Sequence, residues 1–155
     1  MSYKSNQSYR TYDQMVQAAR SGKQNIVEGS IASGTSKKTE LKLIGVSRAS
    51  LGELLEDYGD FLRQRGLDLW PKDSPLAHKV RSLAYTSNKS YTTYKTYIES
   101  EDPKTSANTL ICLIHQTNFL LDKQLHALEK DFLEKGGFTE RLYQSRKNFQ
   151  KENSF

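Results

Sequence analysis

Glycines recur every seven residues inside segments whose composition otherwise favours helix. The first pair is Gly22 and Gly29, and a second series follows a short Ser/Gly/Thr-rich turn at residues 33–36: Gly45, Gly52, Gly59 and Gly66. Each glycine in a helix interior costs about 1 kcal/mol relative to alanine. We therefore expect close packing of backbones, with the first pair matching the second series on a neighbouring helix. The alternative is that the helices simply tolerate these glycines.

Length and composition indicate one helical domain. The chain has 155 residues, of which 35% are hydrophobic and 26% charged, a balance that suits helices with a narrow apolar stripe better than a buried parallel sheet. The longest apolar run, Leu110 to Ile114, is too short to cross a bilayer, and residues 1–7 lack the apolar core of a signal peptide. We expect a soluble, cytoplasmic protein without a membrane partner. The single cysteine, Cys112, agrees with a reducing compartment.

Apolar residues at helical spacing predict four long helices and a short fifth one. We place the first at about 8–32, the second at about 36–65, the third at about 75–98, and the fourth along the stripe from Leu110 to Phe132. The stripe of the first helix comprises Tyr9, Tyr12, Val16, Ala19, Ile26 and Ile31.

Capping residues mark where these helices begin and end. Ser36 and Ser74-Pro75 are start signals, and Gly136-Gly137 is a stop. Thr139 is the expected cap of a basic last helix that ends near Phe149. The fold class is thus all-α: an antiparallel up-down four-helix bundle over residues 1–135, with a C-terminal helical tail over 136–155. The tail either folds onto the bundle or docks on another subunit.

Positive charge is concentrated at the start of the chain. The formal net charge is +5, and residues 1–50 contain eight Lys and Arg against three acids. This asymmetry favours a polyanionic partner, RNA or DNA. Antiparallel helices that meet near residue 34 bring the candidate nucleic-acid-binding residues toward the turn: Arg20, Lys23, Lys37, Lys38, Lys42 and Arg48. The alternative is an ordinary solvated face.

Arg48 interrupts an apolar series in its helix: the residues seven positions before it, and seven and fourteen positions after it, are leucines. Its stem can lie along the edge of the core with its guanidinium in solvent. Otherwise it is paired in an interface or turned toward a central channel.

Asn25 and Glu28 are expected to be structural. If the first two helices are antiparallel and meet near residue 34, Glu28 lies opposite residues 38–42. This placement predicts an ion pair or a helix-end hydrogen bond for Glu28, with Asn25 as a hydrogen-bonding companion. A catalytic carboxylate would need a second acid or a base at fixed reach, so we do not expect an enzyme.

The sequence gives little support for a metal or cofactor site. Cys112 and His115 stand three residues apart, but a closed zinc site needs four ligands and no second pair has suitable spacing. A buried thiol is the default. Among the tyrosines of the third helix, Tyr91 and Tyr94 fall on the apolar stripe, and Tyr97 is the better candidate for stacking on a base.

Two motifs resemble a known family, the bacterial four-helix bundle proteins first met as products of intervening sequences in large-subunit ribosomal RNA genes. In that family an Asn-Ile-Ala-Glu-Gly motif closes the first helix and a Gly-Ser-Leu-x-Glu-Leu element lies in the second. The corresponding segments here, after a similar stretch over Gln14 to Ser21, are Asn25-Ile26-Val27-Glu28-Gly29 and Ala49-Ser50-Leu51-Gly52-Glu53-Leu54. Val27 and Ala49 depart from the pattern. Residues 115–122 through 136–138 resemble the C-terminal extension called a four-helix bundle suffix.

This resemblance implies a homopentameric barrel with no known catalytic activity. The family includes the accessory variability determinant, Avd, of diversity-generating retroelements, which binds nucleic acid and the retroelement's reverse transcriptase. The expected function is therefore that of a non-enzymatic, nucleic-acid-binding accessory protein. The alternative is a protein-interaction scaffold that does not bind nucleic acid. The residues expected to serve structure or oligomer contacts are Asn25, Glu28, Gly29, Gly45, Gly52 and Gly59.

Overall fold

The computed structural model describes residues 3–153, with side chains from Arg10 onward except at Phe138. The predicted core position Tyr9 lies outside the part of the chain whose side chains are described. The described residues form helices and no strand, which confirms the all-α class. The elements are α1 (Tyr3–Ala32), α2 (Lys37–Gln64), α3 (Pro75–Ser82), the 3-10 helix η1 (Leu83–Tyr85), α4 (Tyr91–Ile98), α5 (Pro103–Lys135) and α6 (Phe138–Glu152).

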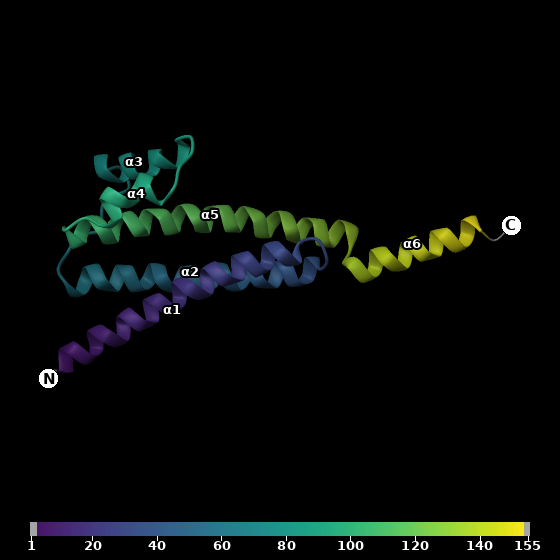
Figure 1. Ribbon diagram of the computed structural model, residues 1–155, viewed down its shortest axis with the longest axis horizontal. Coiled ribbons are helices and arrows are strands. Elements are labelled where there is room, and N and C mark those ends of the chain that lie inside the picture. Colours follow the sequence, from purple (N-terminus) through teal and green to yellow (C-terminus); the bar gives the residue numbers. More distant parts are fainter. Residues whose placement is uncertain (1–2, 154–155) are drawn as a thin grey trace.

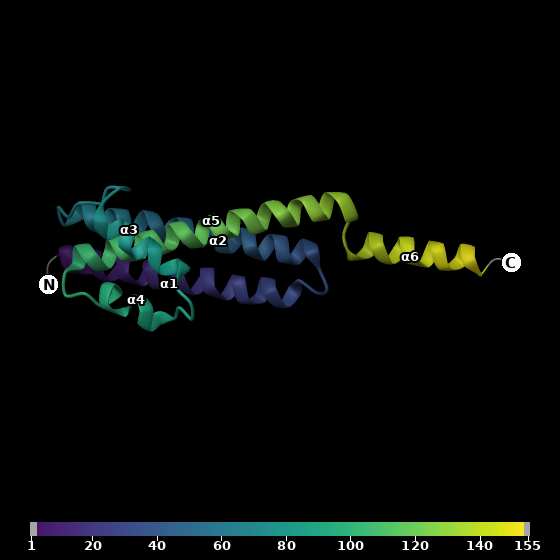
Figure 2. The same cartoon turned by 90° about the horizontal axis from the view of Figure 1, so that it is seen from above.

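Three long helices make the body of the molecule. α1, α2 and α5 run up, down and up, with α2 packed against both of the others (Figures 1 and 2). The short helices α3 and α4 cover the N-terminal part of α5, on the side away from α1 (Figure 1). α6 projects beyond the other end of the body (Figures 1 and 2). The body is therefore a bundle of three long helices, to which α3 and α4 are added on the outer side of α5.

The prediction of one continuous third helix is wrong. The chain leaves the helix after Tyr85, passes through Asn88 in the left-handed region at φ 53°, and starts again at Tyr91. Asn tolerates that conformation because its short polar side chain can hydrogen-bond locally. The Ser90 backbone N–H donates to Thr93 Oγ1 at 3.1 Å, which caps the new helix. The described chain thus contains three long helices where the sequence patterns predicted four.

Most other helix boundaries follow the predicted capping signals. The Thr39 N–H donates to Ser36 Oγ at 3.2 Å and the Ala77 N–H donates to Ser74 Oγ at 3.3 Å. α5 ends at Gly136, whose φ of 68° favours glycine. The predicted cap at Thr139 is wrong, because α6 begins one residue earlier.

Three clusters of buried side chains form the core. One joins α1 to the other long helices through Ala18, Leu54 and Ile114. The other two lie between α2 and α5, around Ile44, Leu121 and Leu128 and around Leu62, Ala107 and Ile111.

α1 packs on α2 through its smallest residues. A Cβ at Gly29 would lie 3.0 Å from Ile44 Cδ1, and one at Gly22 would lie 3.1 Å from Leu51 Cδ2. Ser47 Oγ adds a hydrogen bond of 2.8 Å to the Gly22 carbonyl. The predicted apolar stripe of α1 is wrong in part, because close approach of two backbones requires small residues at the contact.

The larger side chains of that stripe face outward. Tyr12 is 65% exposed and Ile31 is 76% exposed, whereas Ile26 packs against the core.

The glycines of α2 lie on a side of the helix that no other element covers. A Cβ at Gly45 would have no neighbour within 4 Å, and those at Gly52 and Gly59 would meet only arginine side chains of α2 itself. The predicted match between the two glycine series is therefore wrong within the described chain. We refer to Gly45, Gly52 and Gly59 as the glycine face of α2.

Substitution of Gly29 by valine tests the close approach of α1 to α2. We expect the free energy of unfolding to fall by about 1–3 kcal/mol, because the added methyl groups must displace the fully buried Ile44. Urea denaturation measures this loss. The matched control is Gly34→Val, where a Cβ meets nothing within 4 Å. Equal stability of the two variants would contradict the packing described here.

Candidate nucleic-acid interface

The six predicted cations occupy three different environments. Arg20 and Lys23 are exposed on α1, one turn apart, and Lys38 and Lys42 are exposed on α2, also one turn apart. Among the described residues none of these four takes part in an ion pair. They form two separate pairs on two helices.

Arg48 is used to join α2 to α5. Its Nε donates to Asp122 Oδ1 at 2.7 Å and its Nη2 to Asp122 Oδ2 at 3.2 Å. This bidentate geometry is the favourable one for a guanidinium and a carboxylate. The charge of Arg48 is thereby matched within the chain, by a contact between two of its helices. The sequence could not identify Asp122 as the partner, since 74 residues separate the two.

The charge of Lys37 is also partly matched, by a carboxylate of its own helix. Its Nζ lies 3.3 Å from Glu40 Oε2, and the Glu40 side chain is only 7% exposed. A buried carboxylate needs a partner, so Lys37 has a structural task at the start of α2.

A further group of charges gathers where the body meets α6. Lys135 Nζ lies 2.6 Å from Asp131 Oδ1, and this hydrogen bond lowers the pKa of Asp131 and raises the pKa of Lys135. The charges of Lys37 and Arg141 also lower the pKa of Asp131. Cations from α2, α5 and α6 therefore converge on one carboxylate. We call this region, with Lys38 and Lys42 beside it on α2, the basic end.

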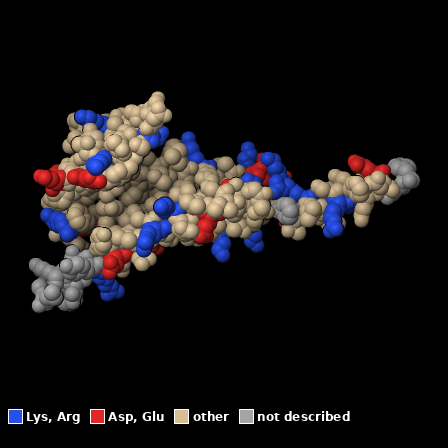
Figure 3. Space-filling model, in the orientation of Figure 1, with Lys and Arg blue, Asp and Glu red and all other residues tan. Residues whose placement is uncertain are grey.

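α6 extends the basic end away from the body. Its exposed residues include Arg141, Arg146, Lys147 and Lys151, against Glu140 and Glu152. Figure 3 shows blue side chains around the end from which α6 departs and along α6 itself, while red ones are prominent near α4. The sequence shows that the tail is basic but does not place it next to the α1–α2 turn. The continuity of α5 into α6 brings them together.

Asn25 and Glu28 do not act as a pair. Asn25 Nδ2 donates to the Ser21 carbonyl at 2.8 Å, and Ser21 Oγ lies 2.9 Å from Ser50 Oγ on α2. Asn25 thus supports the α1–α2 contact. Glu28 is exposed and accepts a hydrogen bond of 2.8 Å from Gln24 Nε2. The ion pair predicted for Glu28 is absent among the described residues.

The tyrosines of the predicted third helix lie on η1 and α4, away from the basic end. Tyr85 is 91% exposed on η1, and Tyr91 donates a hydrogen bond of 2.6 Å to Glu99, which raises the pKa of Tyr91. Tyr97, the predicted stacking residue, is only half-exposed. Of these residues Tyr85 is therefore the most accessible to a base.

Within the described part of the chain, no three His, Cys, Asp or Glu side chains are grouped so that they could hold a metal ion. Cys112 is half-buried, and burial raises the pKa of its thiol although Arg81 acts in the opposite direction. None of the helices described is long and apolar enough to cross a membrane.

No protein-family model, curated protein or solved structure matches this chain. The resemblance to the intervening-sequence bundle family therefore stays a prediction that depends on the two motifs given above.

A double-mutant cycle tests the join between α2 and α5. We expect Arg48→Met and Asp122→Asn to show a coupling energy of about 0.5–1 kcal/mol, because both side chains are partly exposed and screened by solvent. The pair Lys130 and Glu134 is a control, since its charged atoms are 3.8 Å apart on a single helix. Urea denaturation of the four proteins in each cycle gives the coupling. A coupling of zero for Arg48 and Asp122 would show that their contact adds no stability.

Proposed function

We propose that this protein is a non-enzymatic accessory that binds RNA or DNA, with phosphates contacted at the basic end. The observation that carries the proposal is the group of exposed cations at this end, Lys38 and Lys42 on α2 and Arg141 on α6, none of which takes part in an ion pair within the described residues. Lysine and arginine that neutralise phosphates release counterions, which makes such binding strong at low salt and weak at high salt. The exposed cations of α6 lengthen this surface and favour a long polyanion.

The finer parts of the proposal rest on the resemblance to the intervening-sequence bundle family. By that resemblance the protein is an Avd-like partner of a retroelement reverse transcriptase, assembles as a homopentamer and works in the cytoplasm. The family's bundle has four helices. We propose that α3 and α4, folded back on α5, together take the place of its third helix.

The glycine face of α2 supports assembly with further copies. Three helical glycines forgo about 3 kcal/mol of helix propensity, and no packing within the described chain returns it. A helix from another copy that packed closely on Gly45, Gly52 and Gly59 would offset this loss of free energy. The same face serves the alternative function, a protein-interaction scaffold without nucleic-acid binding.

Removal of three charges from the basic end tests RNA binding. We expect Lys38→Gln, Lys42→Gln and Arg141→Gln together to weaken binding and to lower the slope of log K against log salt by about 2, since each lost contact with single-stranded RNA removes about 0.7. Lys37 is left in place because it pairs with the buried Glu40. Fluorescence anisotropy with labelled oligouridine, titrated at several salt concentrations, measures both quantities.

The control removes the same charge from the opposite end of the body, with Lys79→Gln, Lys89→Gln and Lys95→Gln. This variant should bind RNA with nearly unchanged affinity. Equal loss in both triple variants would indicate a nonspecific effect of net charge and remove the basic end as the site. No binding by the unaltered protein at low salt would favour the scaffold.

Substitution of Gly52 by leucine tests the glycine face as an interface. We expect the oligomer to dissociate, because a leucine side chain holds a neighbouring backbone away, whereas within the described chain a Cβ at this position would meet only Arg48 Nη1, at 3.7 Å. Light scattering gives the mass, and circular dichroism shows whether helix content is kept. Gly34→Leu, outside this face, should leave the mass unchanged. A monomeric unaltered protein would refute the assembly.

A further inference from the structure

A cavity of about 520 Å³ lies between the loop that precedes α3, α3 itself and α5. It is distant from the basic end and has no part in the function proposed above. We call it the Trp70 pocket. Its volume is within the range of pockets that bind small molecules, about 300–1,000 Å³.

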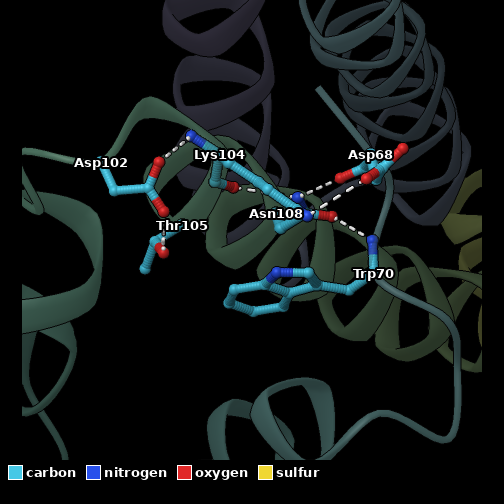
Figure 4. Close-up of polar contacts among 6 residues, drawn as sticks. All are labelled: Asp68, Trp70, Asp102, Lys104, Thr105 and Asn108. Atoms are coloured by element: carbon cyan, nitrogen blue, oxygen red, sulfur yellow. Dashed lines mark hydrogen bonds and ion pairs between the residues drawn. The ribbon is translucent and has the colours of Figure 1, made fainter. Parts of the chain in front are cut away.

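The loop wall of the pocket is held in place by Asn108, which is 1% exposed. Its Nδ2 donates to the carbonyls of Asp68 at 3.0 Å and Lys104 at 2.9 Å, and its Oδ1 accepts from the Trp70 N–H at 2.7 Å (Figure 4). A buried amide with three such bonds fixes the loop on α5. Trp70 is therefore positioned before any ligand arrives, which reduces the entropy that binding would cost.

The α3 wall is held by its own contacts. Ala77 and Val80 are buried, and Gln116 Nε2 on α5 donates to the Arg81 carbonyl at 3.2 Å. The guanidinium of Arg81 in turn donates to the Lys72 carbonyl of the loop. Arg81 thereby bridges two walls of the pocket.

The lining combines an apolar surface with positive charge. Leu69, Trp70, Ile111 and Phe119 supply apolar area, and Lys72 and Arg81 are the charged residues that line the cavity, without any Asp or Glu. Arg81 forms no ion pair within the described residues. The charge of Arg81 acts inside the pocket, because it lowers the pKa of the Cys112 thiol, which burial raises.

We propose that the Trp70 pocket binds a small molecule with an aromatic body and one carboxylate. The aromatic body lies against Trp70 and Ile111, with Phe119 at the mouth. The carboxylate faces Arg81, whose fork of N–H donors suits it and whose charge has no acidic partner in the lining. A neutral ligand of the same shape would leave that charge unmatched.

The chain contains one tryptophan and one cysteine, and both line this pocket. Trp70 fluorescence therefore reports binding, and the rate of Cys112 alkylation by iodoacetamide reports occupancy. The probes are phenylacetate and 4-phenylbutyrate, each compared with the corresponding alcohol. We expect the carboxylates to change the fluorescence saturably and to slow alkylation, and the alcohols to bind more weakly.

Arg81→Gln should weaken carboxylate binding about tenfold or more, which is the usual loss for one charged hydrogen bond, and should weaken alcohol binding much less, through loss of the contact with the Lys72 carbonyl. Lys79→Gln is the matched control, because Lys79 is an exposed cation on the same helix outside the pocket. Phe119→Ser, at an exposed position that does not endanger folding, should weaken carboxylates and alcohols alike. Protection of Cys112 is expressed as the ratio of rates with and without ligand for each variant.

Two results would overturn the assignment. One is the absence of saturable binding by both carboxylates to the unaltered protein. The other is equal affinity for carboxylate in Arg81→Gln and Lys79→Gln, which would mean that Arg81 does not recognise the anion. Circular dichroism of each variant confirms that helix content is retained.

Discussion

The close approach of α1 to α2 determines where most of the chemistry of this chain lies. Two small residues seven apart, Gly22 and Gly29, let the helices meet at a distance that larger side chains would prevent. The contact is reinforced where Ser47 and the Ser21–Ser50 pair add hydrogen bonds across it. Because small residues occupy the contact, Tyr12 and Ile31 of α1 face outward. The hairpin also fixes the turn that brings the first bases of α2 to one end of the body.

α2 is the central helix and presents three different sides. α1 packs on one side of α2 through small residues, and α5 packs on a second side through large aliphatic side chains. No other element of the described chain covers the third side, the glycine face. The second side is closed at its edge by the bidentate contact of Arg48 with Asp122. In the proposed assembly, a helix of another copy would lie on the glycine face, which is uncovered within the described chain.

Local signals in the sequence predicted several helix boundaries, whereas long-range contacts were not predictable. Ser36, Ser74 and Gly136 act within a few residues, so their roles could be read directly. The break between α3 and α4 was missed because tyrosines at helical spacing continue across it, while Asn88 reverses the chain. At the candidate interface, four of the six predicted bases are exposed, whereas Lys37 and Arg48 form ion pairs, and the partner of Arg48 could not be predicted. The Trp70 pocket was missed altogether, since loop, α3 and α5 residues meet there only after folding.

The long helix α5 separates the pocket from the basic end. Phe119 at the pocket mouth and Lys135 are about 24 Å apart at a rise of about 1.5 Å per residue. Screening in physiological salt reduces direct interactions between charges beyond about 8 Å. A carboxylate bound near Arg81 therefore leaves the field at the basic end nearly unchanged. Any influence of such a ligand on nucleic-acid binding would have to pass through movement of α5, which holds the pocket loop through Asn108 near one end and carries Asp131 near the other.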